Sequence, residues 1–164
     1  MSILNPDALE FVSRSPEQTR RLGIRLGSLL QNGDVICMKG DLGSGKTTLT
    51  QGIAQGWGST DQVTSPTFVL VNIYRRPDGS KLHHLDAYRM KDWMEAEDLD
   101  LEMMIEEGAL LVEWPEIISP VLPHDRLDVF LNYVDDTQRS MVFSPEGARY
   151  KTVLSQFRKH VFGG

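Results

Sequence analysis

Cysteine and long apolar runs are scarce in this sequence, and each scarcity excludes a class of protein. Cys37 is the single cysteine among 164 residues, so no disulfide can form within the chain. It lies in a short apolar run, which favours packing over redox or metal chemistry. No run approaches membrane-spanning length, and the N-terminus lacks the pattern of a signal peptide. We therefore expect a cytoplasmic protein.

Positive charge is also in short supply. The chain has 17 Lys and Arg residues against 23 Asp and Glu residues, a net charge of −6. Such a chain is a poor non-specific binder of nucleic acids and anionic membranes, because both carry negative charge. Direct contact with RNA would need a local basic patch. We expect no membrane partner.

The composition is otherwise that of a globular protein. Apolar residues make up 40% and charged residues 24% of the chain, and the length is sufficient to bury a core. The sequence shows no internal repeat and no low-complexity linker. We predict a single domain over residues 1–164.

The strongest motif is Gly-Asp-Leu-Gly-Ser-Gly-Lys-Thr-Thr at residues 40–48. It fits G-x-x-x-x-G-K-[ST], the phosphate-binding loop (P-loop) of nucleotide hydrolases and kinases. Gly40, Gly43 and Gly45 permit positive φ and let the backbone turn successive N–H groups toward phosphate oxygens. The loop residues predicted to bind the nucleotide are Gly43, Ser44, Gly45, Lys46, Thr47 and Thr48.

Three side chains of this loop have distinct expected roles. Lys46, a predicted catalytic residue, brings a full charge to the outer phosphates. The Thr47 hydroxyl is a hard oxygen ligand for Mg²⁺, and Thr48 can donate to the innermost phosphate. The predicted cofactors are therefore ATP or ADP and Mg²⁺. Guanine specificity has no support, because no Asn-Lys-x-Asp stretch occurs.

The flanks of the motif support this interpretation. Residues 35–39 are an apolar run after the turn signal Asn-Gly-Asp and predict a buried strand. Residues 47–55 predict a helix that ends at Gly56, and its positive end points at the phosphates. The alternative is a flexible glycine-rich loop that matches by chance.

A P-loop needs a carboxylate to hold Mg²⁺, directly or through water, at the end of a neighbouring strand. Glu113 follows the apolar run 109–112, which predicts a central strand with its ligand-binding end at Glu113. Asp86 ends the more polar strand 81–86. We predict Glu113 as the main metal carboxylate and Asp86 as a second acid, either metal ligand or base. The alternative is a pair of solvated acids.

Two further positions have both a functional and a structural interpretation. Thr67, in Ser-Pro-Thr, is a candidate sensor of the terminal phosphate or part of a turn before a strand. Trp114 either stacks on a base or packs as a buried tryptophan at a strand end. His83 and His84 are adjacent, so on a strand they face opposite sides and do not form a metal pair.

The remaining segments complete an α/β pattern. The capping box at 15–18 predicts a helix over 16–31, and residues 68–86 predict a β-hairpin. Residues 93–107 predict one or two short helices whose methionines fill the core. Further predicted elements are an edge strand over 9–12, strands over 127–133 and 139–143, and a closing helix over 150–161. The predicted fold class is α/β, a three-layer P-loop NTPase fold with a mixed parallel and antiparallel sheet between helices.

Four stretches, taken together and in order, resemble one family. They are the P-loop, Ser-Pro-Thr-Phe at 65–68, His-Leu-Asp-Ala-Tyr-Arg at 84–89 and Val-Glu-Trp-Pro at 112–115. The P-loop alone is shared by many families, but the combination is similar to the TsaE (YjeE) family. These are small bacterial ATPases of tRNA threonylcarbamoyladenosine biosynthesis.

The resemblance implies a function that spacing does not show. Proteins of that family hydrolyse ATP weakly on their own. They act with two partners, the threonylcarbamoyl transferase subunit TsaD and its paralogue TsaB. They install threonylcarbamoyl on adenosine 37 of tRNA. The resemblance thus implies an ATP hydrolase, weak alone and partner-dependent, that drives or resets this complex and meets tRNA indirectly.

The resemblance also assigns roles by matching position. It implies that Lys46 and Thr47 bind phosphate and Mg²⁺, that Glu113 binds Mg²⁺, and that Asp86 is required for function.

Three residues outside this set are matched as well. Thr67 falls in a switch-like segment, Trp114 lies near the nucleotide, and Arg139 matches an arginine that reaches the nucleotide.

Two other functions remain open. One is a small-molecule or nucleotide kinase, whose arginine-bearing lid would have to come from Arg75, Arg76 or Arg89. The other is a non-catalytic binding module gated by nucleotide.

Overall fold

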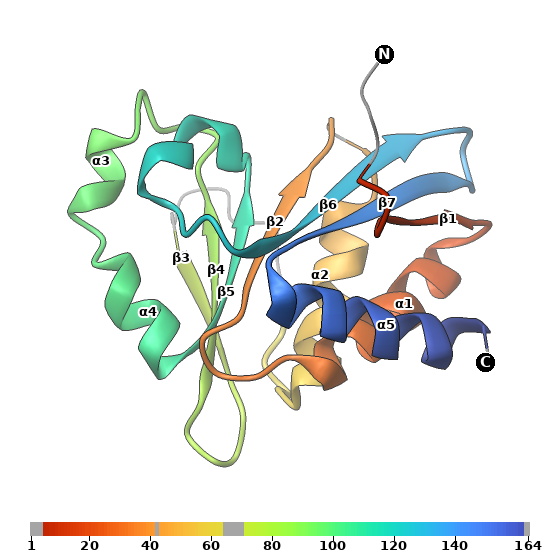
Figure 1. Ribbon diagram of the computed structural model, residues 1–164, viewed down its shortest axis with the longest axis horizontal. Coiled ribbons are helices and arrows are strands. Elements are labelled where there is room, and N and C mark those ends of the chain that lie inside the picture. Colours follow the sequence, from red (N-terminus) through yellow and green to blue (C-terminus); the bar gives the residue numbers. More distant parts are fainter. Residues whose placement is uncertain (1–4, 42, 64–70, 163–164) are drawn as a thin grey trace.

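The computed structural model describes residues 5–41, 43–63 and 71–162 (Figure 1). Its elements, in chain order, are β1 (Leu9–Ser13), α1 (Pro16–Leu29), β2 (Val35–Lys39), α2 (Lys46–Trp57), β3 (Val71–Arg75), β4 (Lys81–Asp86), α3 (Met94–Glu97), α4 (Leu101–Glu107), β5 (Gly108–Glu113), the short 3-10 turns η1 (Pro115–Ile117) and η2 (Ser119–Val121), β6 (Arg126–Tyr133), β7 (Arg139–Glu146) and α5 (Ala148–Phe162).

The strands form one mixed sheet in the order β1-β7-β6-β2-β5-β4-β3. The inner strands β6, β2, β5 and β4 are parallel, while β7 and β1 at one edge and β3 at the other pair antiparallel to their neighbours. Helices cover both faces (Figure 1). The predicted fold class, an α/β protein with a mixed sheet between helices, is confirmed.

Alternation along the central strands gives each face its own core. In β2, Ile36 and Met38 pack with α1, α2 and α5, whereas Val35 and Cys37 pack with residues of α3, α4 and the 3-10 turns. Cys37 is fully buried, so it has the packing role expected from the sequence. Burial raises the pKa of its thiol to about 12.

Helices α1 and α2 meet at glycines. A Cβ on Gly27 of α1 would lie 2.2 Å from the carbonyl oxygen of Ile53, and a Cβ on Gly52 of α2 would lie 2.1 Å from that of Arg20. The two backbones therefore touch, with no side chains between them. A Cβ on Gly56 would likewise meet the carbonyl oxygen of Ile24 at 2.0 Å.

This packing explains one wrong prediction. The sequence predicted that α2 ends at Gly56, but the helix continues to Trp57 and Gly58 takes the left-handed conformation, with φ of 106°. Gly56 is small because α1 is close, not because the helix stops there. Helix α1 ends at Leu29, two residues earlier than predicted.

The other elements follow the predictions with one exception. The edge strand, the β3–β4 hairpin, the β6–β7 hairpin and the two short acidic helices are present. Of the methionines predicted to fill the core, Met104 is buried, but Met94 and Met103 are 55% and 44% exposed. None of the helices in the described ranges is long and apolar enough to cross a membrane.

Candidate functional site

The candidate site forms where the parallel strands end. Strand β2 leads into the P-loop, and β4 and β5 end in Asp86 and Glu113, which are directly paired in the register of these two strands. Met38, just before the loop, is the register partner of Glu113 on the other side of β5. The parallel direction of the three strands therefore brings the loop and both acids to one edge of the sheet.

The P-loop has the backbone that its glycines permit. Gly43 and Gly45 have φ of 80° and 101°, as predicted. Gly40 is not among the residues with positive φ, so that part of the prediction is wrong. Gly40 is required for space instead, because a Cβ there would lie 2.6 Å from both the carbonyl oxygen of Leu131 and Oγ of Ser44.

An open cleft of about 310 Å³ lies at the N-terminus of α2. Side chains and backbone from the P-loop, the two strand ends and the β6–β7 hairpin line it: Gly43, Gly45, Lys46, Thr47, Thr48, Asp86, Tyr88, Glu113, Trp114 and Arg139. The structure thus brings together most of the predicted site residues. Ser44 is buried and is not part of the lining, and Thr67 lies outside the described residues.

Lys46 lines this cleft and has two close side-chain neighbours there. Its Nζ atom lies 4.0 Å from Oε1 of Glu113 and 4.2 Å from the centre of the Trp114 ring. The Lys46 residue is only 7% exposed. The first contact is an ion pair and the second is a cation–π interaction. A full positive charge is therefore fixed where the loop backbone and α2 present their N–H groups.

Glu113 is a buried carboxylate with a second partner on the neighbouring strand. Its Oε2 atom is 2.6 Å from Nε2 of His84. The other ring nitrogen of His84, Nδ1, is 3.0 Å from the hydroxyl of Tyr74. Sequence reasoning assigned no role to His84. The alternation along β4 places His84 on the same face as Asp86, but its contact with Glu113 depends on the pairing of β4 with β5.

Asp86 lies beside Glu113, at the end of the adjacent strand β4, and is only partly exposed. Its Oδ1 atom accepts a hydrogen bond of 2.9 Å from the backbone N–H of Tyr88. Burial raises the pKa of this carboxyl above its ordinary value, and the negative charge of Glu113 acts in the same direction. Tyr88, to which the sequence analysis gave no role, lines the cleft with its ring centre 5.0 Å from that of Trp114.

Arg139, at the start of β7, is hydrogen-bonded to the P-loop. Its Nε donates to the carbonyl oxygen of Gly43 at 2.9 Å, and its Nη1 donates to that of Asp135 at 2.6 Å. The guanidinium also lies 4.8 Å from the centre of the Tyr133 ring. Arg139 therefore joins the β6–β7 hairpin to the loop while it lines the cleft.

Comparison with known proteins matches this arrangement to one family. The family model described as "Threonylcarbamoyl adenosine biosynthesis protein TsaE" matches residues 13–141. The chain belongs to the TsaE family. That membership confirms the resemblance seen in the sequence.

Individual TsaE proteins are similar to this chain over most of their own length. The tRNA threonylcarbamoyladenosine biosynthesis protein TsaE of Bacillus subtilis is 38% identical over 93% of this chain and 95% of its own. The protein of the same name from Streptomyces coelicolor is 40% identical over 81% of this chain and 94% of its own. The crystal structure of Bacillus subtilis YdiB superposes with a TM-score of 0.78 at 30% identity, covering 98% of this chain and 99% of that one.

The oxygen atoms of this TsaE cleft suit Mg²⁺ better than a transition metal. Within residues 5–41, 43–63 and 71–162, no group of three or more His, Cys, Asp or Glu side chains could hold a metal ion. The cleft instead offers the Thr47 hydroxyl and the carboxylates of Asp86 and Glu113. Mg²⁺ is usually bound by one or two carboxylates, with waters and substrate phosphates completing its shell.

Proposed function

We propose that this protein is a Mg²⁺-dependent ATPase that drives or resets the complex making N6-threonylcarbamoyladenosine at position 37 of tRNA. The observation that carries the proposal is the cleft at the N-terminus of α2, which unites Lys46 and Thr47 with Asp86 and Glu113. Membership of the TsaE family and the names of the relatives support the tRNA modification.

Each group has a role that follows from its chemistry. Lys46 and the N–H groups of the loop bind the β- and γ-phosphates, since charge-assisted hydrogen bonds to phosphate are strong. Thr47 and Glu113 hold the metal, and Trp114 and Arg139 border the nucleotide. When bound, Mg²⁺ neutralises charge on the phosphates.

Asp86 is the remaining acid of the cleft. We assign it to the water that attacks the γ-phosphate, as the group that orients this water and accepts its proton. Its raised pKa supports this role, because a carboxyl that binds a proton more readily is a better base.

The partners in this proposal are a TsaD-type transferase subunit and its TsaB-type paralogue. Transfer of the threonylcarbamoyl group takes place on the partner, and tRNA is met through the complex. The net charge of −6 is consistent with indirect contact.

Arg76, one of the three arginines named for a kinase lid, is bound away from the cleft. Helix α2 begins at the cleft with Lys46 and ends at Trp57, where the guanidinium of Arg76 lies 3.8 Å from the Trp57 ring centre. Arg76 also donates to both carboxylate oxygens of Asp78. This arginine is therefore held at the far end of α2 and does not supply a lid over the phosphates.

Release of inorganic phosphate from ATP, measured with and without the two partners, tests the proposal. We expect slow release alone and faster release in the complex. Lys46→Ala removes the phosphate contact and should abolish productive ATP binding. Near-normal affinity and hydrolysis in that variant would contradict the assignment, and phosphate appearing on an added acceptor would indicate a kinase.

Glu113→Ala tests the metal role separately. We expect a folded protein that has lost the Mg²⁺-dependent part of nucleotide binding, measured by calorimetry with Mg²⁺ and with EDTA. Unchanged Mg²⁺ dependence would move the metal role to Asp86.

A further inference from the structure

Three buried polar side chains on adjacent strands form a chain that ends in the cleft. Tyr74 of β3, His84 of β4 and Glu113 of β5 are 2%, 1% and 6% exposed. The Tyr74 hydroxyl is 3.0 Å from Nδ1 of His84, and Nε2 of His84 is 2.6 Å from Oε2 of Glu113. Buried polar groups with this many partners form a rigid network.

The carboxylate sets the direction of these hydrogen bonds. An ionised Glu113 only accepts, so Nε2 of His84 carries the proton and donates it. In the neutral ring Nδ1 is then the acceptor, and Tyr74 donates its O–H to it. Burial raises the pKa of Tyr74 to about 12, which keeps its hydroxyl protonated as this direction requires. The Tyr74 hydroxyl thereby matches the tautomer of His84 that Glu113 selects.

We propose that His84 is a positioning residue for Glu113: its N–H holds Oε2, so that the second oxygen, Oε1, stays turned toward Lys46 and the cleft. This inference rests on the proposed function, because it assumes that Glu113 serves a Mg²⁺–nucleotide site. Oε1 is the oxygen 4.0 Å from Nζ of Lys46. Without the hydrogen bond to His84, the carboxylate is free to turn and take both oxygens toward Lys46.

The neighbouring histidine provides a matched control. His83 lies on the same strand and is 3% exposed, but it faces the α4 side, with its Nε2 atom 3.5 Å from Oε2 of Glu107. A substitution there disturbs β4 to a similar degree and leaves Glu113 untouched. Any effect confined to His84 therefore reports on the contact with Glu113.

Two amides separate positioning from packing. The side-chain nitrogen of Gln reaches the place of Nε2 and can still donate to Glu113, whereas the nitrogen of Asn reaches only the place of Nδ1. We would compare His84→Gln, His84→Asn, Tyr74→Phe and the control His83→Asn. The measurement is binding of a non-hydrolysable ATP analogue by calorimetry, with Mg²⁺ and with EDTA, and thermal unfolding reports whether each variant is folded.

We expect His84→Asn to lose about 10- to 100-fold of the affinity gained from Mg²⁺, the usual cost of removing a group that orients a metal ligand. His84→Gln should keep most of that gain, Tyr74→Phe should lose less than His84→Asn, and His83→Asn should be unchanged. Should His84→Asn fail to fold, the ordering of His84→Gln, Tyr74→Phe and the control still tests the role.

Three results would overturn the inference. If the wild type gains affinity from Mg²⁺ and a folded His84→Asn keeps that full gain, this inference is overturned and the proposed function is not. An equal loss in His83→Asn, or an equal loss with EDTA, would show that β4 matters only for packing. A wild type that binds the analogue no better with Mg²⁺ than with EDTA would overturn the proposed function and this inference together.

Discussion

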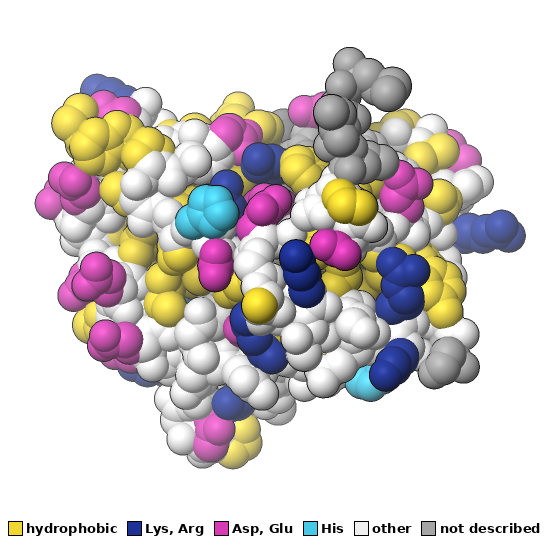
Figure 2. Space-filling view, viewed as in Figure 1, with side chains coloured by type: hydrophobic (Ala, Val, Ile, Leu, Met, Phe, Trp, Pro, Cys, Tyr) yellow, Lys and Arg dark blue, Asp and Glu magenta, His cyan; other side chains and the backbone are white. Residues whose placement is uncertain are grey.

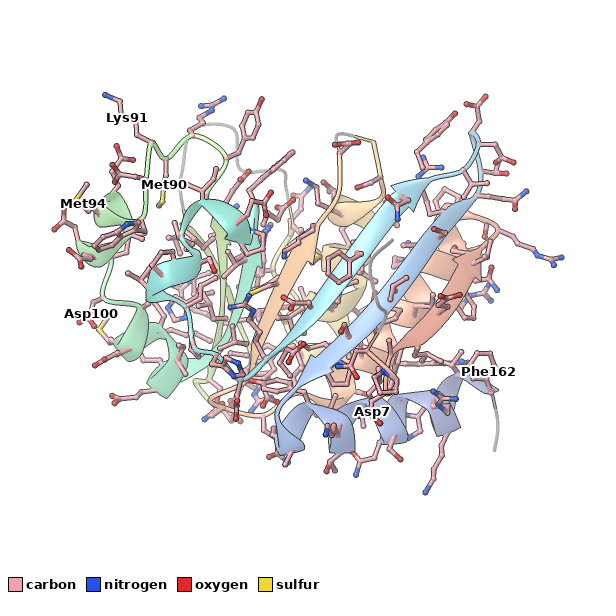
Figure 3. All side chains as sticks on the ribbon, turned by 45° about the horizontal axis from the view of Figure 1, so that its top comes forward. Asp7, Met90, Lys91, Met94, Asp100 and Phe162 are labelled. Carbon is pink, nitrogen blue, oxygen red and sulfur yellow. The ribbon has the colours of Figure 1, made fainter. Side chains whose placement is uncertain are left out.

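The two faces of the sheet are built in different ways. On one face, α1, α2 and α5 are long, and α1 and α2 touch through their backbones at glycines. On the other face, α3 and α4 are short, and Met94 and Met103 project into solvent. Figure 3 shows Met94 at the outer side of α3.

Charge follows the same division. Helix α5 has four basic residues and no acidic one: Arg149, Lys151, Arg158 and Lys159. Residues 94–107, which include α3 and α4, have no basic residue and these acidic ones: Glu95, Glu97, Asp98, Asp100, Glu102, Glu106 and Glu107. Figure 2 shows acidic side chains over the α3 and α4 side and basic ones over α5. The P-loop helix α2 is thus packed within the face formed by α1, α2 and α5, called the rigid face below because α1 and α2 touch backbone to backbone; α3 and α4 form the opposite face, called the thin face.

The largest expected effect is on the rigid face. Gly27→Ala puts a Cβ 2.2 Å from the Ile53 carbonyl oxygen, so α2 must move away from α1. We expect a loss of about 3 kcal/mol in the free energy of unfolding, with weaker nucleotide binding because Lys46 begins α2. Urea unfolding measures the loss. Ser28→Ala, at the next and exposed position, is the control, and equal stability of the two variants would refute close backbone packing.

A smaller loss is expected where α5 joins this face. Arg149 donates two hydrogen bonds to the buried carboxylate of Asp34, at 3.0 and 2.8 Å, and a third to the carbonyl oxygen of Leu29. Arg149→Met leaves the buried Asp34 carboxylate without its charged partner, although the backbone N–H of Gln31 still donates to it. The expected cost is about 2 kcal/mol in chemical unfolding, since part of the pair is solvated. Lys151→Met, an exposed basic residue of the same helix, should cost little.

The thin face should be the more sensitive one to acid through His83. Burial lowers the pKa of His83 below its ordinary value of 6.5. Its contribution to stability is therefore complete above pH 6.5 and is lost as the pH falls below it, because the unfolded chain then binds the proton more readily. We expect a slope of at most about 1.4 kcal/mol per pH unit. Unfolding curves between pH 7.5 and 5.5 should lose this slope in His83→Leu.

The smallest effect is expected at the exposed methionines. Met94→Ser combined with Met103→Ser should change the free energy of unfolding by no more than about 0.5 kcal/mol. Met104→Ala, at a buried methionine of α4 next to Met103, should cost more, about 2 kcal/mol. A large loss in the double variant would mean that the thin face contributes to the core after all.

Local signals predicted much of the fold and the site. The P-loop, the strand before it and the acids at strand ends can each be recognised within a short window of sequence. The mistakes depend on contacts between distant segments. Gly56 was interpreted as a helix end because its neighbour Ile24 is far away in sequence, and the partner of His84 follows from the pairing of β4 with β5. Met94 and Met103 could not be told from Met104 by composition.

The thiol of Cys37 has a practical consequence. It is fully buried and its pKa is about 12, so in the folded protein it will not react with maleimides at neutral pH. A cysteine introduced on the surface, for example at Ser155 of α5, can then carry a fluorophore or spin label as the only modified position. Motion at that position can be followed in solution without first replacing the native cysteine.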